Sequence, residues 1–264
     1  MFHLHRRLSA AGAIAVLVLS ALVLASCGGD EPAVAEEPSP TLGSRAVSSA
    51  TPANNTATEA VARQMAALLA KARADLPLDL ADGNTVGKAG APLQLVTYED
   101  FQCPYCLKFV AEQEPGLIEK YVKSGKLQIT NRHLPILGGE SARAAVASQC
   151  AAEQKQFWQY HNALFAVEAE AGQFGAEKIN VGRFSDANLK TYARQLGLDA
   201  AAFAACLDSG KYDQLLVDHT REAKELGVTG VPAFTLNGQS LGSGIPADPS
   251  AWDKLFEQAL KSKP

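Results

Sequence analysis

The stretch Phe101–Cys106, FQCPYC, places two cysteines three residues apart in a chain of 264 residues that has only five cysteines. Cysteines at this spacing hold a metal, close a structural disulfide, or exchange electrons with the sulfur atoms of another protein. Pro104 suits the first position of a helix, where its missing N–H is not needed. A helix is therefore predicted to begin directly after Cys103.

Cys103 is predicted to be the nucleophile of the pair. A cysteine at a helix N-terminus faces unpaired backbone N–H groups and the positive end of the helix dipole, which stabilise the thiolate and lower the thiol pKa. A spacing of three puts Cys106 on the same helix face, one turn further on. Cys106 is therefore predicted to be the more deeply buried, resolving thiol, which attacks or leaves a mixed disulfide formed at Cys103.

Three other roles are open to this pair. A zinc site needs a second close pair of ligands, which the sequence lacks. A purely structural disulfide closes a very small loop with little entropic gain. Copper(I) suits soft thiolates, but the only methionines are Met1 and Met65, and His161 in FWQYHNALF is expected to pack among aromatic residues. No metal is predicted.

The sequence around the pair predicts a strand, a helix and a second strand. Leu93–Tyr98 has the composition of a buried strand that leads to Cys103, and Lys126–Pro135 is the second strand. Pro115 is expected to kink or interrupt the helix between them. Strand, helix and strand in this order favour a right-handed parallel crossover.

The second half of the chain adds helices and a hairpin. Apolar residues at helical spacing predict a helical stretch over about residues 140–226. Ala233–Leu236, followed by Asn237 and Gly238, predicts a hairpin, and Asp248–Lys261 an amphipathic helix. The complete order is that of an α/β thioredoxin fold with an inserted helical subdomain.

Several motifs together resemble the DsbA-like branch of the thioredoxin superfamily. They are YEDFQCPYC, RHLP, QFWQYHNALF, GLDAAAFAACLDSGKY and KELGVTGVPAFTLNG. The resemblance covers about Asp79–Lys261. It implies a bacterial extracytoplasmic thiol-disulfide oxidoreductase.

The resemblance also assigns roles to the residues beside the thiols. It implies that Pro232, in GVP, is cis and lies near the sulfurs together with Pro104 and Tyr105, while Val231 offers its backbone to the substrate chain. A cis X-Pro bond costs only about 0.5–1 kcal/mol, and an outward-facing backbone group pairs with an extended peptide. The alternative is an ordinary trans proline that opens a strand.

One position departs from the family pattern. Thioredoxin and many DsbA-like proteins carry a buried acid six residues before the first active-site cysteine, whereas this chain has Thr97. Glu99 and Asp100 are close in sequence but are predicted to lie at the surface, in the loop after the strand. Proton transfer at Cys106 is therefore left either to water or to one of these two carboxylates.

The N-terminus predicts export and attachment to a membrane. Arg6 and Arg7 precede an apolar run and then small residues, which makes residues 1–26 a signal peptide. LASC, Leu24–Cys27, resembles the lipobox of bacterial lipoproteins, which implies acylation of Cys27 and an anchor in the bilayer. The alternative is a single uncleaved transmembrane helix.

The rest of the chain divides by composition into three parts. Residues 27–57 are rich in Pro, Ala, Ser and Thr and are expected to form a lipidated, flexible tether. Residues 58–76 are expected to form a helical spacer that either docks on the domain or extends the tether. Residues 77–264 are expected to form the DsbA-like domain.

Cys150 and Cys206 remain once Cys27 is acylated and Cys103 and Cys106 form a redox pair. An even remainder in an exported domain predicts one structural disulfide. Joining these two cysteines closes a long loop, which stabilises the fold by roughly 4 kcal/mol in the chain-entropy model. The alternative is two buried free thiols.

Composition excludes some classes of protein. The net charge of −4 is mild and the basic residues are scattered, so no nucleic acid partner is expected. An apolar content of 47% in a chain of this length allows a full core, which excludes a small scaffold held mainly by disulfides.

Together these features predict a membrane-tethered, extracytoplasmic protein disulfide oxidoreductase of the bacterial cell envelope. It is expected to introduce disulfides into exported proteins with cysteine thiols, with the Cys103–Cys106 disulfide in place of a cofactor. The resemblance implies a quinone-linked membrane partner that reoxidises it. A disulfide reductase or isomerase of the same fold, a copper(I) chaperone and a peptide-binding lipoprotein remain as alternatives, since the direction depends on the reduction potential.

Overall fold

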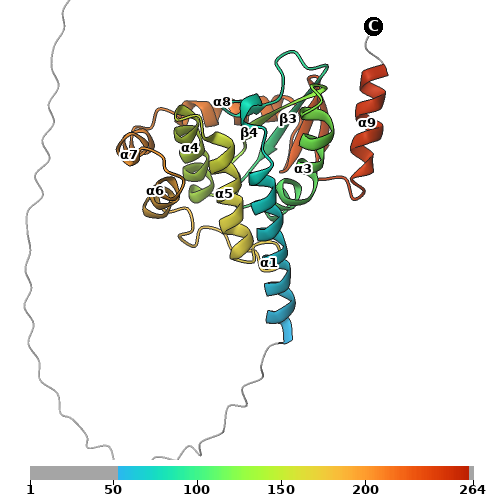
Figure 1. The fold of residues 1–264 in the computed structure, drawn as a ribbon. Helices are drawn as coiled ribbons and strands as arrows, with labels where there is room; N and C mark the ends of the chain where they lie inside the picture. Colours follow the sequence, from blue (N-terminus) through green and yellow to red (C-terminus); the bar gives the residue numbers. More distant parts are fainter. Residues whose placement is uncertain (1–52, 262–264) are drawn as a thin grey trace, which may run out of the picture. The chain divides into compact units, whose positions relative to one another are not determined.

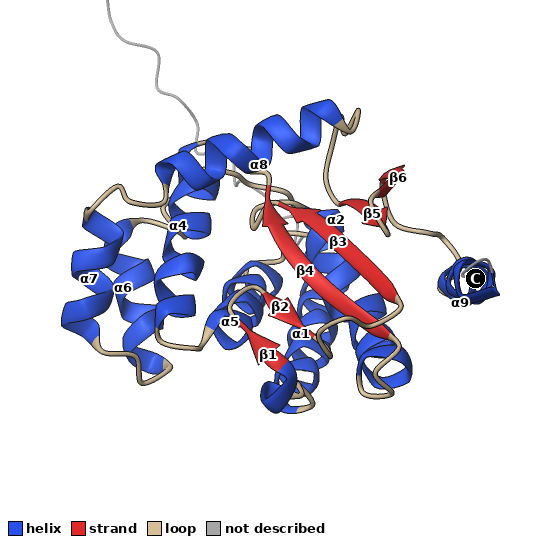
Figure 2. Ribbon diagram, turned by 90° about the horizontal axis from the view of Figure 1, so that it is seen from above, coloured by secondary structure: helices blue, strands red, loops and turns tan. Residues whose placement is uncertain are grey.

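The computed structural model describes residues 53–261 of the chain. Within these residues the centre is a six-stranded sheet with the order β1-β2-β4-β3-β5-β6 (Figures 1 and 2). The strands are β1 (Ala81–Asp82), β2 (Thr85–Val86), β3 (Leu93–Glu99), β4 (Leu127–His133), β5 (Ala233–Leu236) and β6 (Gln239–Ser243). β3 and β4 are parallel, and β5 runs antiparallel to β3. A parallel pair followed by an antiparallel hairpin is the thioredoxin topology that the sequence predicts.

The two central strands carry buried residues at alternate positions, so that one face of the sheet packs against helices. Leu95 on β3 lies opposite Ile129 on β4, and both are buried in the main core. Tyr98 belongs to a second, smaller cluster with Ala223 of α8 (Asp213–Glu225) on the other face. The predicted strand Leu93–Tyr98 is one residue too short, because β3 includes Glu99.

The helical segment after Cys103 changes type along its length but runs without a gap through Pro115, where the sequence predicts a kink or an interruption. It consists of α2 (Pro104–Lys108), a π-helical turn η2 (Phe109–Gln113), α3 (Glu114–Leu117) and a second π-helical turn η3 (Ile118–Val122). Pro115 stands in the first turn of α3, where its missing N–H removes no interior hydrogen bond. The chain therefore continues as helical turns across the proline instead of ending there.

The predicted helical insertion consists of α4 (Gly139–Glu153), α5 (Phe157–Glu170), α6 (Asp186–Gln195), α7 (Ala200–Asp208) and α8. Of these helices, α4, α6 and α7 lie together beside the sheet (Figure 2). A disulfide between Cys150 and Cys206 joins α4 to α7, with the two Cα atoms 5.7 Å apart. The structural disulfide that the sequence predicts between these two cysteines is thus present in the structure.

Helix α1 (Ala53–Ala74) packs along α5 (Figure 1). Met65 and Leu69 are buried in the main core, and Val61 packs against it. The helical spacer predicted over residues 58–76 is therefore docked on the domain, but its helix ends at Ala74 and begins at Ala53, inside the segment predicted to be a flexible tether. A short 3-10 turn, η1 (Leu78–Leu80), then leads into β1.

The C-terminal part completes the sheet and its cover. The turn between β5 and β6 uses Asn237 and Gly238 at φ values of 51° and 81°, the left-handed conformation that a tight hairpin of this kind requires. Helix α9 (Ser250–Lys261) begins two residues later than the predicted Asp248. Its Trp252 contacts the rings of Phe109 and Phe234, with centroids 6.1 and 5.0 Å apart.

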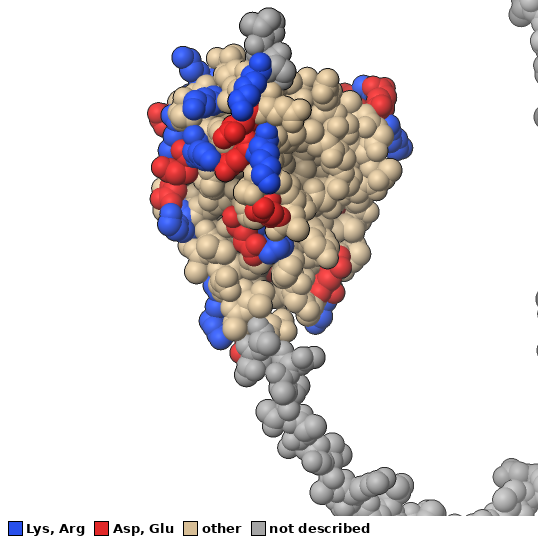
Figure 3. Space-filling model, turned by 90° about the vertical axis from the view of Figure 1, so that its right-hand side faces the viewer, with Lys and Arg blue, Asp and Glu red and all other residues tan. Residues whose placement is uncertain are grey.

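The surface drawn in Figure 3 carries basic and acidic side chains next to one another, together with a broad area of uncharged residues. Lys120 and Asp253 form an ion pair, with Nζ and Oδ1 2.8 Å apart. In the stretch from residue 53 to 261, no helix is both long and apolar enough to cross a membrane. The predicted signal peptide, Cys27 and most of the predicted tether lie outside the described residues.

Candidate active site

The two cysteines of FQCPYC lie at the start of α2, at the end of the connection from β3. Cys103 is the N-cap residue, and its Sγ accepts a hydrogen bond from the backbone N–H of Cys106 at 3.4 Å. Both cysteines are free thiols, and Cys106 is fully buried whereas Cys103 keeps 5% of its surface exposed. The outer thiol is therefore the one that another molecule reaches first.

The environment shifts the two thiols in opposite directions. A hydrogen bond from the Cys106 thiol has the largest effect on Cys103 and lowers its pKa, while burial opposes this and backbone N–H groups reinforce it. Burial raises the pKa of Cys106 well above the ordinary thiol value, and the hydrogen bond and charge of Cys103 and the charge of Glu99 act in the same direction. One thiol is set up as a nucleophile and the other stays protonated.

The segment before β5 lies directly beside the outer thiol. The Val231–Pro232 peptide bond is cis, and the carbonyl oxygen of Val231 lies 3.5 Å from Cys103 Sγ. Pro232 is buried and Val231 is half-buried. The structure thus brings together Cys103, Cys106, Val231 and Pro232, which are far apart in the sequence.

Glu99 and Asp100 are buried, which makes the predicted surface position of both residues wrong. Glu99 is 4% exposed and Asp100 is 2% exposed. The alternation of β3 continues one residue further than predicted, so Glu99 shares a face with Thr97 and points inward. Asp100 follows the strand and is held by hydrogen bonds, described next.

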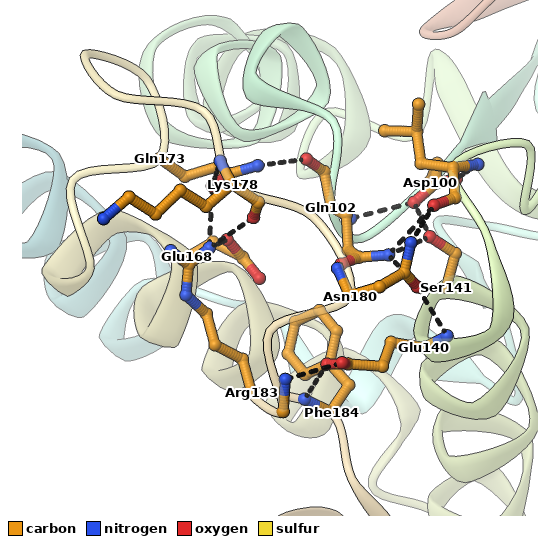
Figure 4. A network of polar contacts seen from close by, with 12 residues as sticks. Asp100, Gln102, Glu140, Ser141, Glu168, Gln173, Lys178, Asn180, Arg183 and Phe184 are labelled. Carbon is orange, nitrogen blue, oxygen red and sulfur yellow. Dashed lines mark hydrogen bonds and ion pairs between the residues drawn. The ribbon is translucent and has the colours of Figure 1, made fainter. Parts of the chain in front are cut away.

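Asp100 and Gln102 are the centre of a polar network that holds the approach to the thiols (Figure 4). Asp100 accepts hydrogen bonds from the backbone N–H groups of Gln102 and Leu137, each at 2.8 Å, and from Ser141 Oγ at 2.6 Å. Gln102 donates to Ser141 Oγ at 2.7 Å and accepts from the backbone N–H of Asn180 at 2.6 Å. The loop before Cys103 is therefore fixed to α4 and to the segment before α6.

The connection between α5 and α6 is attached to the same loop. Gln173 donates to the carbonyl oxygen of Gln102 at 2.7 Å. Arg183 donates to Glu168 at 2.6 Å and to the side chain of Gln173 at 2.7 Å, so a buried ion pair supports that contact (Figure 4). Gly138 must be a glycine here, because its φ is 118° and a Cβ would lie 2.4 Å from the Asn180 side chain.

Exposed apolar side chains stand at the start of α2 and on the segments that are hydrogen-bonded to this loop. Tyr105, between the two cysteines, is 57% exposed and meets Phe174 edge to face at a centroid distance of 6.1 Å. Ile136, Ile179 and Val181 are 52%, 41% and 54% exposed, on the segments that Asp100 and Gln102 hold in place. An apolar rim, made of these five residues, therefore lies on the segments next to Cys103.

Sequence reasoning missed a cluster of three buried ionisable groups, one of which, Glu99, acts on the Cys106 thiol. Glu99 forms an ion pair with His161, with Oε2 and Nε2 2.8 Å apart, and Glu114 of α3 is buried nearby with a raised pKa. The alternation Leu93, Leu95, Thr97 was a signal for Glu99, because its next member points inward. No local pattern indicated that His161, from the insertion, would be its partner.

Fold and site together define a thioredoxin-fold protein with a pair of unequal cysteine thiols at a helix start and a cis-proline segment beside them. A family model described as Thioredoxin matches residues 80–258. Because this match covers well over half of the chain, the protein belongs to that family. Its fold is also similar to the folds of two solved structures.

Two solved structures share this fold. BdbD from Bacillus subtilis, in its oxidised form, has a TM-score of 0.58 and 20% identity, and the match covers 68% of this chain and 94% of that one. α-DsbA1 from Wolbachia pipientis has a TM-score of 0.56 and 24% identity, with 72% and 98% covered. The predicted thioredoxin fold with a helical insertion is confirmed.

Curated relatives include proteins of two kinds. A probable disulfide bond formation protein D from Bacillus anthracis is 24% identical over 177 residues, which are 66% of this chain and 78% of that protein. The Na(+)/H(+) antiporter NhaA 3 from Salinispora tropica is 30% identical over 166 residues, which are 62% of this chain. The match covers only 23% of the antiporter, so the chain corresponds to about a quarter of it.

Proposed function

We propose that this protein is an extracytoplasmic, membrane-tethered thiol-disulfide oxidoreductase that introduces disulfides into exported proteins. The observation that carries the proposal is the unequal pair Cys103 and Cys106. One thiol is slightly exposed with a lowered pKa, and the other is fully buried with a raised pKa. Because only the outer sulfur is exposed, another thiol attacks at Cys103, and the lowered pKa of Cys103 makes it a good leaving group when the mixed disulfide is resolved.

In the oxidising direction, a substrate thiolate attacks Cys103 in the Cys103–Cys106 disulfide. The bond between the two cysteines breaks, Cys106 leaves with the electron pair, and a mixed disulfide joins the substrate to Cys103. A second substrate thiolate then attacks its own partner sulfur in the mixed disulfide and releases Cys103 as a thiolate. The low pKa of Cys103 makes it a good leaving group in this step.

The substrate class follows from the surroundings of Cys103. The backbone of Val231, next to the sulfur, suits pairing with an extended chain. The apolar rim suits a segment with apolar side chains near its cysteine, which a protein exposes before it folds. These features support unfolded exported proteins as substrates.

Location and reoxidation rest on the sequence. The signal peptide and the lipobox at Cys27 support a membrane-anchored position outside the cytoplasm. Each turnover leaves two electrons on the reduced pair, so an electron acceptor is needed to restore the disulfide. A quinone-linked membrane protein meets this need, and the anchor keeps the domain close to it.

The test is the reduction potential of the Cys103–Cys106 pair, measured against glutathione on the full chain with Cys27→Ala. A value near the roughly −120 mV of DsbA supports an oxidase, and one near the roughly −270 mV of thioredoxin makes a reductase the better assignment. A Cys150→Ala/Cys206→Ala variant beside it is expected to keep the same potential, since that disulfide joins α4 to α7.

A second measurement separates the enzyme from a binding protein. The oxidised chain is mixed with a reduced, unfolded protein, and the loss of free thiols is followed. Oxidation that disappears in Cys103→Ser supports the proposal. Copper(I) binding that survives competing thiols, without any oxidation, assigns the pair to metal transfer, and peptide capture unaffected by Cys103→Ser assigns the site to binding alone.

A further inference from the structure

A stripe of polar residues crosses the sheet face behind the thiols. In a strand, residues two apart share a face, so Thr97 and Glu99 on β3 point the same way as Leu95. In the parallel register, Thr97 lies opposite Asn131 and Glu99 opposite His133 on β4. All four polar residues are at most 4% exposed. Burying polar groups in such a core costs free energy unless they are hydrogen-bonded.

Glu99 has one oxygen engaged and one free. Its Oε2 lies 2.8 Å from Nε2 of His161, while its Oε1 is buried and forms no hydrogen bond. His161 Nδ1 lies 2.9 Å from Oδ1 of Asn162, so both ring nitrogens have partners. The imidazole is otherwise enclosed by aromatic rings, among them Phe101 and Phe165 at centroid distances of 5.5 and 5.0 Å.

Glu114 adds a second buried carboxyl group to this pair. It is 2% exposed, and its Oε1 also forms no hydrogen bond. Burial and the charge of Glu99 raise the pKa of Glu114 to about 8, so that it is protonated at neutral pH. The cluster thus contains two acids and one base, contributed by β3, α3 and α5.

The charges in the cluster depend on one another. Burial acts to lower the pKa of His161, but the charge and hydrogen bond of Glu99 and the charge of Glu114 outweigh it, and the pKa is raised. His133, the other buried histidine beside it, has its pKa lowered well below the ordinary value, chiefly by burial. At neutral pH His161 is therefore held toward its charged form beside Glu99, while Glu114 and His133 are neutral.

We propose that Glu99, held in place by His161 and backed by Glu114, is the group that exchanges a proton with Cys106 during thiol-disulfide exchange. The assignment rests on the proposed function of the cysteine pair. It follows from the free, buried oxygen of Glu99 and from its influence on the buried Cys106 thiol. Thr97, on the same face, has a hydroxyl that does not ionise at neutral pH and cannot take this role.

In the reaction that resolves a mixed disulfide, the proton of Cys106 moves to Glu99. When another thiol X is joined to Cys103, the Cys106 thiol gives its proton to the Glu99 carboxylate and its sulfur attacks Cys103. The Cys103–X bond breaks, X leaves as a thiolate with the electron pair, and the Cys103–Cys106 disulfide forms. The proton on Glu99 is released to solvent afterwards. In the oxidising direction the same proton moves from Glu99 to Cys106 as it leaves.

The competing interpretation is that Glu99 and His161 only anchor α5 to β3. A second buried ion pair provides a matched control for that role. Glu168 has no exposed surface, lies 2.6 Å from Arg183, and also keeps one oxygen without a hydrogen bond. It belongs to the network of Figure 4, and it is not among the groups that act on Cys106.

The experiment isolates the step at Cys106. The full-length chain with Cys27→Ala is reduced at Cys103 and Cys106 only, and mixed with one equivalent of 5,5′-dithiobis(2-nitrobenzoate) from about pH 5 to pH 10. The first thionitrobenzoate is released when Cys103 attacks the reagent. The second is released when Cys106 resolves the mixed disulfide, so the second phase reports proton loss from Cys106.

Glu99→Gln is expected to leave the first phase within about twofold of the parent chain and to slow the second at least about tenfold at neutral pH. The difference between the second-phase rates of the parent chain and of Glu99→Gln is expected to shrink at high pH, where hydroxide removes the proton from Cys106 directly. Glu168→Gln is expected to leave the ratio of the two rates unchanged, because any loosening of the loop before Cys103 affects both phases alike. A second phase within twofold of the parent at every pH, in a folded Glu99→Gln variant, overturns the proposal.

Glu114→Gln covers the case in which Glu99→Gln does not fold. Below about pH 8 the side chain of Glu114 is a neutral carboxylic acid. Glutamine is also neutral and has nearly the same shape, so the variant has the same charge as the parent chain in this pH range. The parent is expected to show a bend near that pH in its second phase, and the variant none. A bend that persists in Glu114→Gln contradicts the proposal. Because the reagent is not a protein, this result stands apart from the test of the proposed function.

Discussion

Cys103 and Cys106 carry the same side chain, yet the fold shifts their pKa values in opposite directions. The difference arises within one helical turn, because Cys103 caps α2 at the edge of the core and Cys106 points into it. The hydrogen bond between the two thiols couples them, since it lowers the pKa of one and raises that of the other.

This coupling predicts a difference between two substitutions of Cys106. Cys106→Ala removes the donor that has the largest effect on Cys103, so the pKa of Cys103 is expected to rise. Cys106→Ser keeps a hydroxyl donor in the same place and is expected to leave the pKa of Cys103 below that of the alanine variant. Thiolate absorbance in the ultraviolet, titrated against pH, measures both, and equal values in the two variants would contradict this account.

Among individual residues, the sequence predicted the positions of the two thiols well and the burial of the residues around them less well. The position of Cys103 follows from Pro104 and the preceding strand, which are local signals. The pairing of Glu99 with His161 joins β3 to a helix of the insertion, 62 residues away, and depends on tertiary packing alone. The predicted loop position of Glu99 was wrong because the end of a strand depends on its partner, here His133 on β4.

The apolar residues of helix α1 are buried by its packing against neighbouring helices. Its exposed residues give it the composition of a polar spacer, but Met65 and Leu69 are 4% and 1% exposed because α1 packs along α5. Helicity was readable from the spacing of these residues. The docking was not, because a single apolar stripe suits a partner in the same chain or in another.

The docking of α1 predicts a stability effect. Leu69→Ala is expected to lower the free energy of unfolding by about 2–5 kcal/mol, as for other buried leucines. Leu78→Ala is the matched control, because Leu78 is 47% exposed and its truncation is expected to cost no more than about 0.5 kcal/mol. Urea unfolding followed by circular dichroism measures both, and equal losses would show that α1 is a spacer and not part of the core.

Helices and strands marked by a clear local sequence pattern lie close to their predicted positions, whereas the two shortest strands were not predicted. The β5–β6 hairpin was marked by Asn237 and Gly238, and α9 by its amphipathic pattern. The β1–β2 hairpin was not predicted. Its strands have two residues each, which is too short for any alternation, and they are positioned by pairing with β4.

The whole molecule contains buried histidines that affect its response to acid. Burial lowers the pKa of His219 to about 4, and the charge of Arg132 adds to this. The unfolded chain takes up a proton near the ordinary value of 6.5, whereas the folded chain does not until about pH 4. The stability that comes from a neutral His219 is therefore complete above pH 6.5 and is lost as the pH falls toward 4.

We therefore expect the free energy of unfolding to fall between pH 6.5 and 4, with His219 contributing at most about 1.4 kcal/mol per pH unit. His219→Asn keeps an acceptor for the His133 backbone N–H that now donates to Nδ1 at 3.1 Å, and removes the titration. Its unfolding free energy is expected to fall less steeply over the same range. Parallel slopes in urea titrations at several pH values would assign the acid response to other groups.

The exposure of Tyr105 has a consequence for protein engineering. The residues on either side of the Pro104–Tyr105 dipeptide, from Glu99 to Cys103 and Cys106, are at most 5% exposed, and most of them are tied to other segments by hydrogen bonds. Tyr105 is 57% exposed, and its side chain contacts the ring of Phe174. Within this motif, the dipeptide is therefore the part that can be varied in a combinatorial library. Such a library would yield proteins with the same fold that differ in oxidising strength.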